Sequence, residues 1–381
     1  MSKQTVKEPL VRIAKRDPLP LWKSWGIRII AFALSMIVYV LVVYLFTKQS
    51  PGQVLKYILK GTIGMTEKKV FSDITLWKTI REIMFLYGVA LALSPAFKMR
   101  FWNVGGEGQI IVGGIATIII MRNLAPHIGS NTVTLIIMAV ISAIAGSIWS
   151  AIPAIFNATH KTNETLFTLM MNYIAIQLAA FINVIWEKKA GAGKLGVIND
   201  AGKEGWLPQS FMSKLVGPDG YMLILLFAVA IAIFIYFYMN KSKHGYELAV
   251  IGDSQDTARY AGIGVKRVII RTVAVSGAIC GFMGFLIVSG ADHTVSSTTA
   301  GGRGFTAIIV AWLGKLNVFY MLLVSAMLVC LGNGANELAS RAGLDKSLGD
   351  VLTGVVLFFI LASELFVQYK LIFRHSQEEA E

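Results

Sequence analysis

Residues 244–271 read HGYELAVIGDSQDTARYAGIGVKRVIIR and lie between two long apolar segments. The middle of this stretch predicts a very short helix, because Asp253 or Ser254 can serve as its N-cap and Asp256 falls in its first turn. Gly262 can end that helix as a left-handed residue. The stretch and the three residues before it contain six Lys/Arg, which predicts that it lies on the cytoplasmic side of a membrane. A short, capped helix in such a place can be gripped by a soluble partner.

The composition of the whole chain places this stretch in a membrane protein. Of the 381 residues, 55% are hydrophobic and only 15% are charged, whereas an ordinary soluble domain has about a quarter charged residues. Several uncharged runs reach the length of about 18 residues that spans a bilayer. We therefore expect an all-α polytopic membrane protein. The net charge of +13 is attributed to topology and lipid headgroups rather than nucleic acid, because no nucleic-acid-binding motif accompanies it.

The apolar runs predict about ten spans with both termini in the cytoplasm. A cytoplasmic tail, residues 1–26, is expected before the transmembrane domain, residues 27–368, and a second cytoplasmic tail, residues 369–381, after it. The spans are expected at residues 27–46, 80–97, 105–121, 132–155, 165–186, 221–239, 272–290, 305–314, 318–334 and 349–368.

The connections between these spans carry four further expectations. Residues 187–219 are read as an extracytoplasmic loop, with a small hairpin as one option, and residues 240–271 as the cytoplasmic loop. The run 305–314 is only about half a bilayer long, so it is alternatively re-entrant. Residues 47–79 are read as an outer segment that alternatively holds another membrane element. Arg81 and Glu82, at the start of the second span, are expected at the outer interface.

A second unusual stretch is FWNVGGEGQIIVGG, residues 101–114, which has five glycines and runs directly into an apolar segment. It predicts a broken or late-starting helix at membrane depth. Glu107 is expected to brace this break by accepting N–H bonds from the glycines; direct contact with a solute, together with Asn103 and Gln109, is the alternative. Residues 300–314 are also glycine-rich, and interrupted spans in the two halves of a chain often mark a transport site.

Three more residues are candidates for a translocation pathway. Asn172 lies in the middle of a predicted span, where it either makes interhelical hydrogen bonds or lines the pathway. Phe305 and Trp312 are either packing residues or a surface on which a planar ring stacks. Gly277 and Gly281 form a small-xxx-small pair that allows close helix contact.

Four stretches, in one order, resemble the permease subunits of ATP-binding cassette importers in the branched-chain amino acid, ribose and nucleoside group. They are NVGGEGQIIVGG (103–114), NETLFTLMMNYIA (163–175), GYELAVIGDSQDTARYAGI (245–263) and GRGFTAIIVAWLGKLN (302–317). The similarity is greatest to the simple sugar and nucleoside permeases that work with Bmp-type lipoproteins. It covers about residues 100–320; the first 80 residues and the C-terminal tail contribute little.

The resemblance implies a transport subunit in the plasma membrane of a bacterium and not an enzyme, with nucleosides as the best candidate solute. The chain has no G-x-x-x-x-G-K-[ST] phosphate loop, so a separate ATP-binding subunit would bind ATP and Mg. A second, related permease subunit and an extracytoplasmic substrate-binding lipoprotein would be the other partners. Coupling to the ATPase would fall to Asp253, Ser254, Asp256, Ala258, Arg259, Tyr260, Ala261 and Gly262. Of these, Ala258, Tyr260 and Ala261 would pack into a groove on that subunit.

Two other classes of function make different demands on the sequence. An ion-coupled secondary transporter predicts a pair of ionisable residues at mid-membrane, where Glu107 has little company. An integral membrane enzyme needs a nucleophile with an acid/base partner or a metal cluster at one membrane face, and the sequence has no such grouping.

Overall fold

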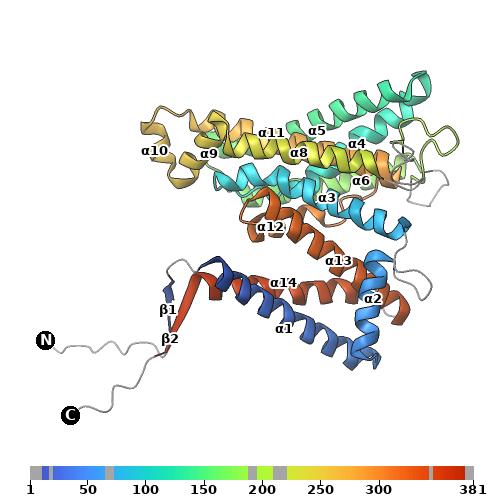
Figure 1. The fold of residues 1–381 in the computed structure, drawn as a ribbon. Helices are drawn as coiled ribbons and strands as arrows, with labels where there is room; N and C mark the ends of the chain where they lie inside the picture. The colour runs from blue at the N-terminus through green and yellow to red at the C-terminus, as the bar shows by residue number, and fades with distance from the viewer. Residues whose placement is uncertain are drawn as a thin grey trace, which may run out of the picture. The chain divides into compact units, whose positions relative to one another are not determined.

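The computed structural model describes residues 11–16, 20–64, 73–187, 195–208, 221–342 and 346–373. Helices make up nearly all of it, as the composition predicts (Figure 1). The chain divides into two compact units, residues 69–329 and residues 1–68 with 330–381.

The larger unit contains the elements that carry most of the sequence motifs. Its helices are α3 (Asp73–Lys98), α4 (Gly106–Asn123), α5 (Asn131–His160), α6 (Glu164–Ile185), α8 (Met222–Asn240), α9 (Lys243–Asp253), α10 (Gln255–Tyr260), α11 (Val265–Ile287), α12 (Arg303–Leu313) and the start of α13 (Val318–Ala342). A short 3-10 turn, η1 (Ala125–His127), follows α4, and a π-helical turn, η2 (Val288–Asp292), continues α11.

Helix α11 is the centre of this unit and packs on α3, α4 and α5. The contacts are close because glycines face backbone. A Cβ on Gly281 would lie 2.3 Å from the Ser142 carbonyl oxygen of α5, and one on Gly277 would lie 2.4 Å from the Gly146 carbonyl oxygen. The predicted close contact at the small-xxx-small pair is confirmed.

The smaller unit is built from the two ends of the chain. It contains the strand β1 (Val11–Lys15), the helices α1 (Leu21–Thr47) and α2 (Pro51–Ile63), the later part of α13, α14 (Lys346–Gln368) and the strand β2 (Tyr369–Phe373). The two strands pair antiparallel, with Val11 opposite Phe373. Helix α1 packs on α14, and Arg28 of α1 forms an ion pair with Glu364 of α14 at 3.0 Å.

Eight helices in the described part of the chain are long and apolar enough to cross a membrane. Two shorter apolar helices, Arg303–Leu313 and Gly354–Val367, account for the other two predicted spans. With 11 residues, α12 rises only about 16 Å, roughly half of a bilayer core. The predicted run 305–314 is therefore a half-span, and residues 293–302 before it are not helical beyond single turns.

The structure differs from the predicted connections in three places. The segment 47–79 contains the helix α2, which was the alternative for it, and α3 begins seven residues before the predicted residue 80. The tail 369–381 begins with the strand β2. In the loop predicted at residues 187–219, residues 195–208 form turns and no hairpin, and residues 188–194 and 209–219 lie outside the described residues.

Candidate functional site

The chain breaks between α3 and α4. Residues 99–105 are not helical, and the side chain of Asn103 in this break is fully buried. Its Oδ1 accepts hydrogen bonds from the backbone N–H of Gly105 (3.0 Å) and from Nε2 of Gln109 (3.1 Å). Asn103 thereby fixes the direction in which α4 starts, at the glycine-rich stretch where a late-starting helix is predicted.

Asn172 of α6 supports the same break from the neighbouring helix. Its Oδ1 accepts the N–H of Gly108 at 2.8 Å, and its Nδ2 donates to the Val104 carbonyl at 3.0 Å. One turn earlier on α6, the Thr168 hydroxyl accepts the N–H of Val104 at 3.2 Å. Because Asn172 is only 1% exposed and both its amide oxygen and its amide nitrogen are hydrogen-bonded, its geometry is that of an interhelical hydrogen-bonding residue.

Glu107 joins two helix N-termini. It lies in the first turn of α4, its Oε1 accepts the N–H of Gly302 at 2.7 Å, and its Oε2 accepts the N–H of Gly304 at 2.8 Å. Gly302 is the N-cap of α12, and Gly304 lies in its first turn. The first amides of a helix lack partners within it and carry partial positive charge, so one carboxylate stabilises both helix ends. We call Glu107, Gly302 and Gly304 the helix junction.

The sequence predicted a brace at Glu107 but was wrong about its donors. They come from the second glycine-rich stretch, 300–314, and not from residues 101–114. Gly304 allows the start of α12 to lie close to the start of α4, since a Cβ at this position would lie 2.2 Å from the Glu107 backbone nitrogen. Gly302 has a left-handed backbone, with φ of 74°, which turns the chain into α12.

The segment before α12, residues 293–302, runs beside α4. Val295 lies near Gly114, at 3.7 Å from the position of a Cβ there, while Gly302 contacts Glu107, so the segment and α4 run in opposite directions. At its far end, the ring of His293 stacks on Trp206 with centroids 3.5 Å apart. Trp206, in the loop between α6 and α8, therefore covers this end of the segment.

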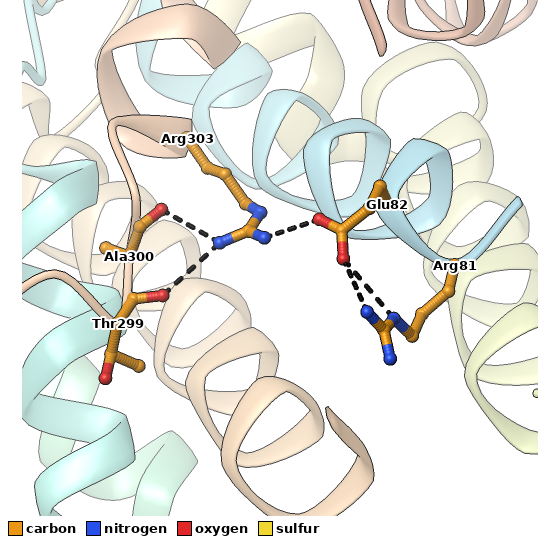
Figure 2. Close-up of polar contacts among 5 residues, drawn as sticks. All are labelled: Arg81, Glu82, Thr299, Ala300 and Arg303. Atoms are coloured by element: carbon orange, nitrogen blue, oxygen red, sulfur yellow. Dashed lines mark hydrogen bonds and ion pairs between the residues drawn. The ribbon is translucent and has the colours of Figure 1, made fainter. Parts of the chain in front are cut away.

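Figure 2 shows a charged cluster beside the junction that the sequence reading missed. Arg303, the first residue of α12, donates from Nη1 to the carbonyls of Thr299 (3.3 Å) and Ala300 (3.2 Å), and its Nη2 contacts Glu82 of α3. Glu82 also pairs with Arg81 at 3.0 Å. The three charged side chains are only 16–24% exposed. We call Arg81, Glu82 and Arg303 the charged cluster.

The charges of Arg81 and Glu82 were expected at the outer interface. Because α3 begins at Asp73 and not at residue 80, both residues lie about two turns after the start of the helix. The signal that could have found the cluster is an arginine within the second glycine-rich stretch, because ionisable groups inside a span are costly and mark functional sites by default.

The two candidate aromatic residues lie on one face of α12, seven residues apart, and are both partly exposed. Phe305 is 41% and Trp312 is 44% exposed. Trp312 stacks on Trp102 from the break before α4, with centroids 5.1 Å apart and an angle of 16° between the rings. Trp102 is also 44% exposed and was not among the predicted residues. The structure thus brings together an aromatic pair, one residue from the break before α4 and one from α12, while Phe305 stays apart from it.

At the end of the unit where α3, α8 and α11 meet α9 and α10, the predicted short helix is α10, and a second helix, α9, precedes it (Figure 1). Ser254 is the N-cap of α10, and its hydroxyl accepts the N–H of Thr257 at 3.2 Å. Asp253 ends α9 instead of capping α10, which settles the choice between the two residues. Asp256 lies in the first turn of α10, and Gly262 has a left-handed φ of 76° as expected of a residue that ends a helix.

The side chains of α10 face in different directions. Ala258 is fully buried in a cluster with Phe101, Leu248 and Val265 of the same chain, so the expectation that it packs on a partner is wrong. Tyr260, in contrast, is 94% exposed. Asp256, Arg259 and Ala261 are exposed as well.

Helix α9 is held tightly against the end of α3. A Cβ on Gly252 would lie 2.3 Å from the Lys98 carbonyl oxygen, and the Lys98 ammonium donates to the Met239 carbonyl of α8 at 2.6 Å. The break that leads to α4 begins directly after Lys98. Helices α9 and α10 and the helix junction are therefore connected through the last turn of α3.

Glu247 fastens α9 to α11. Its Oε2 accepts a hydrogen bond from Arg271 at 2.9 Å and lies 3.3 Å from Nδ1 of His244. The hydrogen bond from Arg271 is the main cause that lowers the pKa of Glu247 below its ordinary value. In the part of the chain that the structure describes, no three His, Cys, Asp or Glu side chains are grouped as metal ligands.

Comparison with known proteins adds a family to this geometry. Residues 76–361 match the family described as branched-chain amino acid transport system / permease component. This range contains both glycine-rich stretches, the charged cluster and α9–α10. No solved structure matches the chain.

Three similar proteins have names that state a transport role. The guanosine ABC transporter permease protein NupP of Bacillus subtilis is 28% identical over 289 residues, which cover 75% of this chain and 80% of that protein. The nucleoside ABC transporter permease protein NupB of Lactococcus lactis is 25% identical, with 75% and 79% covered. The glucose ABC transporter permease protein TsgB13 of Haloferax volcanii is 24% identical, with 94% and 93% covered.

Proposed function

Because this chain belongs to the branched-chain amino acid transport system permease family, we propose that it is a membrane subunit of an ATP-binding cassette importer that carries nucleosides. The observation that carries the proposal is the helix junction, where one buried carboxylate joins the N-termini of α4 and α12. Interrupted helices that meet within a membrane are typical of transport pathways, because irregular backbone is tolerated there only inside protein or beside a cavity.

The nucleoside is favoured over a sugar by two of the three relatives described above, whose names state guanosine or nucleoside transport. The aromatic pair Trp102–Trp312 agrees with that choice, since a planar base stacks on an indole ring better than a hexose does. The glucose permease keeps a sugar as the second candidate. Three buried polar side chains support the pathway without lining it: those of Asn103, Gln109 and Asn172.

A separate subunit binds ATP and Mg and holds α10; we call this ATP-binding subunit the motor. Tyr260 and the exposed charges of α10 supply its contact surface, and Ser254 and Gly262 fix where the helix begins and ends. A second, related permease and an extracytoplasmic substrate-binding lipoprotein complete the importer, which lies in the plasma membrane of a bacterium.

The packing offers a route from the motor to the pathway. Ala258 joins α10 to the buried cluster that includes Met99 and Phe101 from the break. Gly252 holds α9 on the last turn of α3. When ATP binding draws the motor subunits together, α10 moves with them. The movement is transmitted to the break before α4, because the contacts between these elements are closely packed. The helix junction then changes the side to which the pathway opens.

Reconstituted transport tests the proposal. The chain is placed in proteoliposomes with its permease and ATP-binding partners, and uptake of labelled guanosine and of glucose is measured with the binding lipoprotein outside. We expect guanosine uptake that requires ATP and stops when the phosphate-loop lysine of the motor is replaced.

Two other outcomes would contradict or change the proposal. Guanosine uptake that persists without ATP but collapses with a protonophore would favour the ion-coupled transporter, with Glu107 as its ionisable group. ATP-dependent uptake of glucose without guanosine uptake would leave the importer in place and change its solute.

A further inference from the structure

A polar cavity of about 720 Å³ lies between the turn that joins α5 to α6 and the segment that runs from α10 into α11. The turn contributes residues 157–165, and the other wall is formed by residues at the start of α10 and of α11. All of these residues belong to the larger unit. The cavity opens beside α10, the helix that the proposed function assigns to the motor.

Both carboxylates in the wall accept a hydrogen bond from a neighbouring side chain. Arg259 donates to Asp256 at 2.7 Å, and Asn157 donates from Nδ2 to the Glu164 carboxylate at 3.0 Å. Among the described residues, neither carboxylate forms an ion pair with a lysine of the cavity wall. Their role is to hold the two walls in shape.

Two lysines in the wall are different. Lys161 and Lys266 both line the cavity and are exposed, and among the described residues neither ammonium has an ion-pair partner. Lys161 is fixed in place by its left-handed backbone, with φ of 55°, and by the hydrogen bond from its N–H to the Asn157 carbonyl at 2.9 Å. The cavity wall holds three cationic side chains, Lys161, Lys266 and Arg259, and two carboxylates, Asp256 and Glu164, so its net charge is +1. The rest of the polar wall is made of amide and hydroxyl groups.

We propose that this cavity receives an acidic side chain of the ATP-binding subunit, held by Lys161 and Lys266. This inference rests on the proposed function, because it gives that subunit a second point of contact beside α10. One exposed helix of six residues can be held by a partner in several rotations. A carboxylate seated between the α5–α6 turn and α10 fixes one of them, since charge complementarity sets the register of an interface more than its affinity.

The cavity also shows how α10 is turned toward its partner. Gln255, Asp256 and Arg259 line the cavity, and Ala258 faces the chain's own core. Tyr260 is left to project freely. The motor is thus expected to contact the chain through Tyr260 on one side of α10 and through the cavity on the other.

The test measures binding of the ATP-binding subunit to the full-length chain in detergent, with its permease partner present. Lys161→Glu and Lys266→Glu, alone and together, are compared with Lys241→Glu, an exposed lysine of the same cytoplasmic loop outside the cavity. We expect the double variant to weaken binding at low salt by about tenfold or more and to reduce its salt dependence, while Lys241→Glu leaves both unchanged. An acidic residue of the motor changed to lysine should restore binding to the double variant.

Tyr260→Ala separates this inference from the proposed function. If Tyr260→Ala weakens binding and the lysine variants do not, the cavity does not hold the motor and the proposed function stands. If no ATP-binding subunit binds even the unchanged chain, both are wrong. A lysine effect that is seen only in vesicles with anionic lipid, and not in detergent, would assign the cavity to a lipid headgroup and overturn the proposal.

Discussion

The helix junction and the pair α9–α10 are both made of short helical starts, glycines and carboxylates, yet they are held together in different ways. At the junction, Glu107 bonds residues almost 200 positions away in the sequence, and its side chain is 6% exposed. In α10, Ser254 caps a residue three positions away, and the next charged pair, Asp256 with Arg259, is exposed.

The difference shows which interactions stabilise each region. A buried carboxylate that loses its donors leaves polar groups unpaired, which costs much more than a lost surface contact. The junction is therefore expected to be rigid and sensitive to any change. Helix α10 depends on small local contributions and on one buried residue, Ala258, which suits a surface that a partner would hold and move.

Removing the carboxylate of the junction should have the largest effect. Glu107→Ala leaves the N–H groups of Gly302 and Gly304 without an acceptor, at a cost of about 1–3 kcal/mol for each group. We expect a sharply lower yield of folded protein and no uptake, measured by size-exclusion chromatography and transport assay. Glu107→Gln keeps one acceptor and should lose less. Normal yield of the alanine variant with an altered solute preference would show that Glu107 lines the pathway instead.

A methyl group placed at two glycines compares the regions directly. Gly304→Ala forces a Cβ against the Glu107 backbone, and overpacking of this kind costs about 1–3 kcal/mol or more. Gly262→Ala meets nothing within 4 Å and has only its left-handed backbone to oppose it, at about 1 kcal/mol. The thermal midpoints of the two purified variants measure the loss of stability that each substitution causes. Equal midpoints would mean that the close approach at Gly304 is not rigid.

The charged cluster should show an effect between these two regions. Arg303→Gln removes a bond to Glu82 and two bonds to backbone carbonyls, which frees residues 299–303 from α3. Since both charges are about a quarter exposed, we expect a loss below the about 3–5 kcal/mol of a fully buried pair.

The exchange variant, with Glu82→Arg and Arg303→Glu together, should restore part of the uptake. Arg28→Gln serves as the control, because Arg28 and Glu364 are exposed to a similar degree in the smaller unit. If the exchange restores nothing while Arg28→Gln causes the same loss, the cluster has no special role in transport.

Ser254→Ala should have a smaller effect on folding and a clear one on coupling. Loss of an N-cap costs about 1 kcal/mol, and here it loosens the start of α10 without touching the core. We expect normal membrane insertion and fewer solute molecules carried for each ATP hydrolysed. Ser242→Ala, which removes the cap of α9, is the matched control. An unchanged ratio of uptake to hydrolysis in Ser254→Ala would contradict a coupling role for α10.

The smallest effect should be the pH dependence at Glu247. Since Arg271 lowers the pKa of Glu247 from its ordinary 4.5, the folded state favours the ionised carboxylate. Its stabilisation is present above pH 4.5 and is lost as the pH falls through the lowered value of the folded state. Glu247→Gln should therefore lower the thermal midpoint at pH 7 and make little difference at the most acidic pH that the protein tolerates. A difference that grows as the pH falls would reverse the sign.

Much of this arrangement follows from local sequence. The glycines of residues 101–114 predict the break before α4, and Ser254 and Gly262 predict the limits of α10, because caps and left-handed turns depend on neighbours in the chain. The donors to Glu107 could not be predicted, since a carboxylate accepts from any N–H that the fold brings near. Ala258 was misplaced for a similar reason: its burial depends on Phe101 and Val265, and a capping pattern does not fix the rotation of a helix.

The contact between Gly252 and the Lys98 carbonyl has a practical consequence for observing the protein at work. It leaves no gap in which α9 could slide against α3, and α10 follows α9 after a single residue. In the chain without its motor, a fluorophore attached at the exposed position of Tyr260 would therefore report displacements of α3 from a position that labelling reagents can reach. The proposed attachment point of the motor is therefore also a position from which movement of α3 can be measured, without a label on any lipid-facing residue.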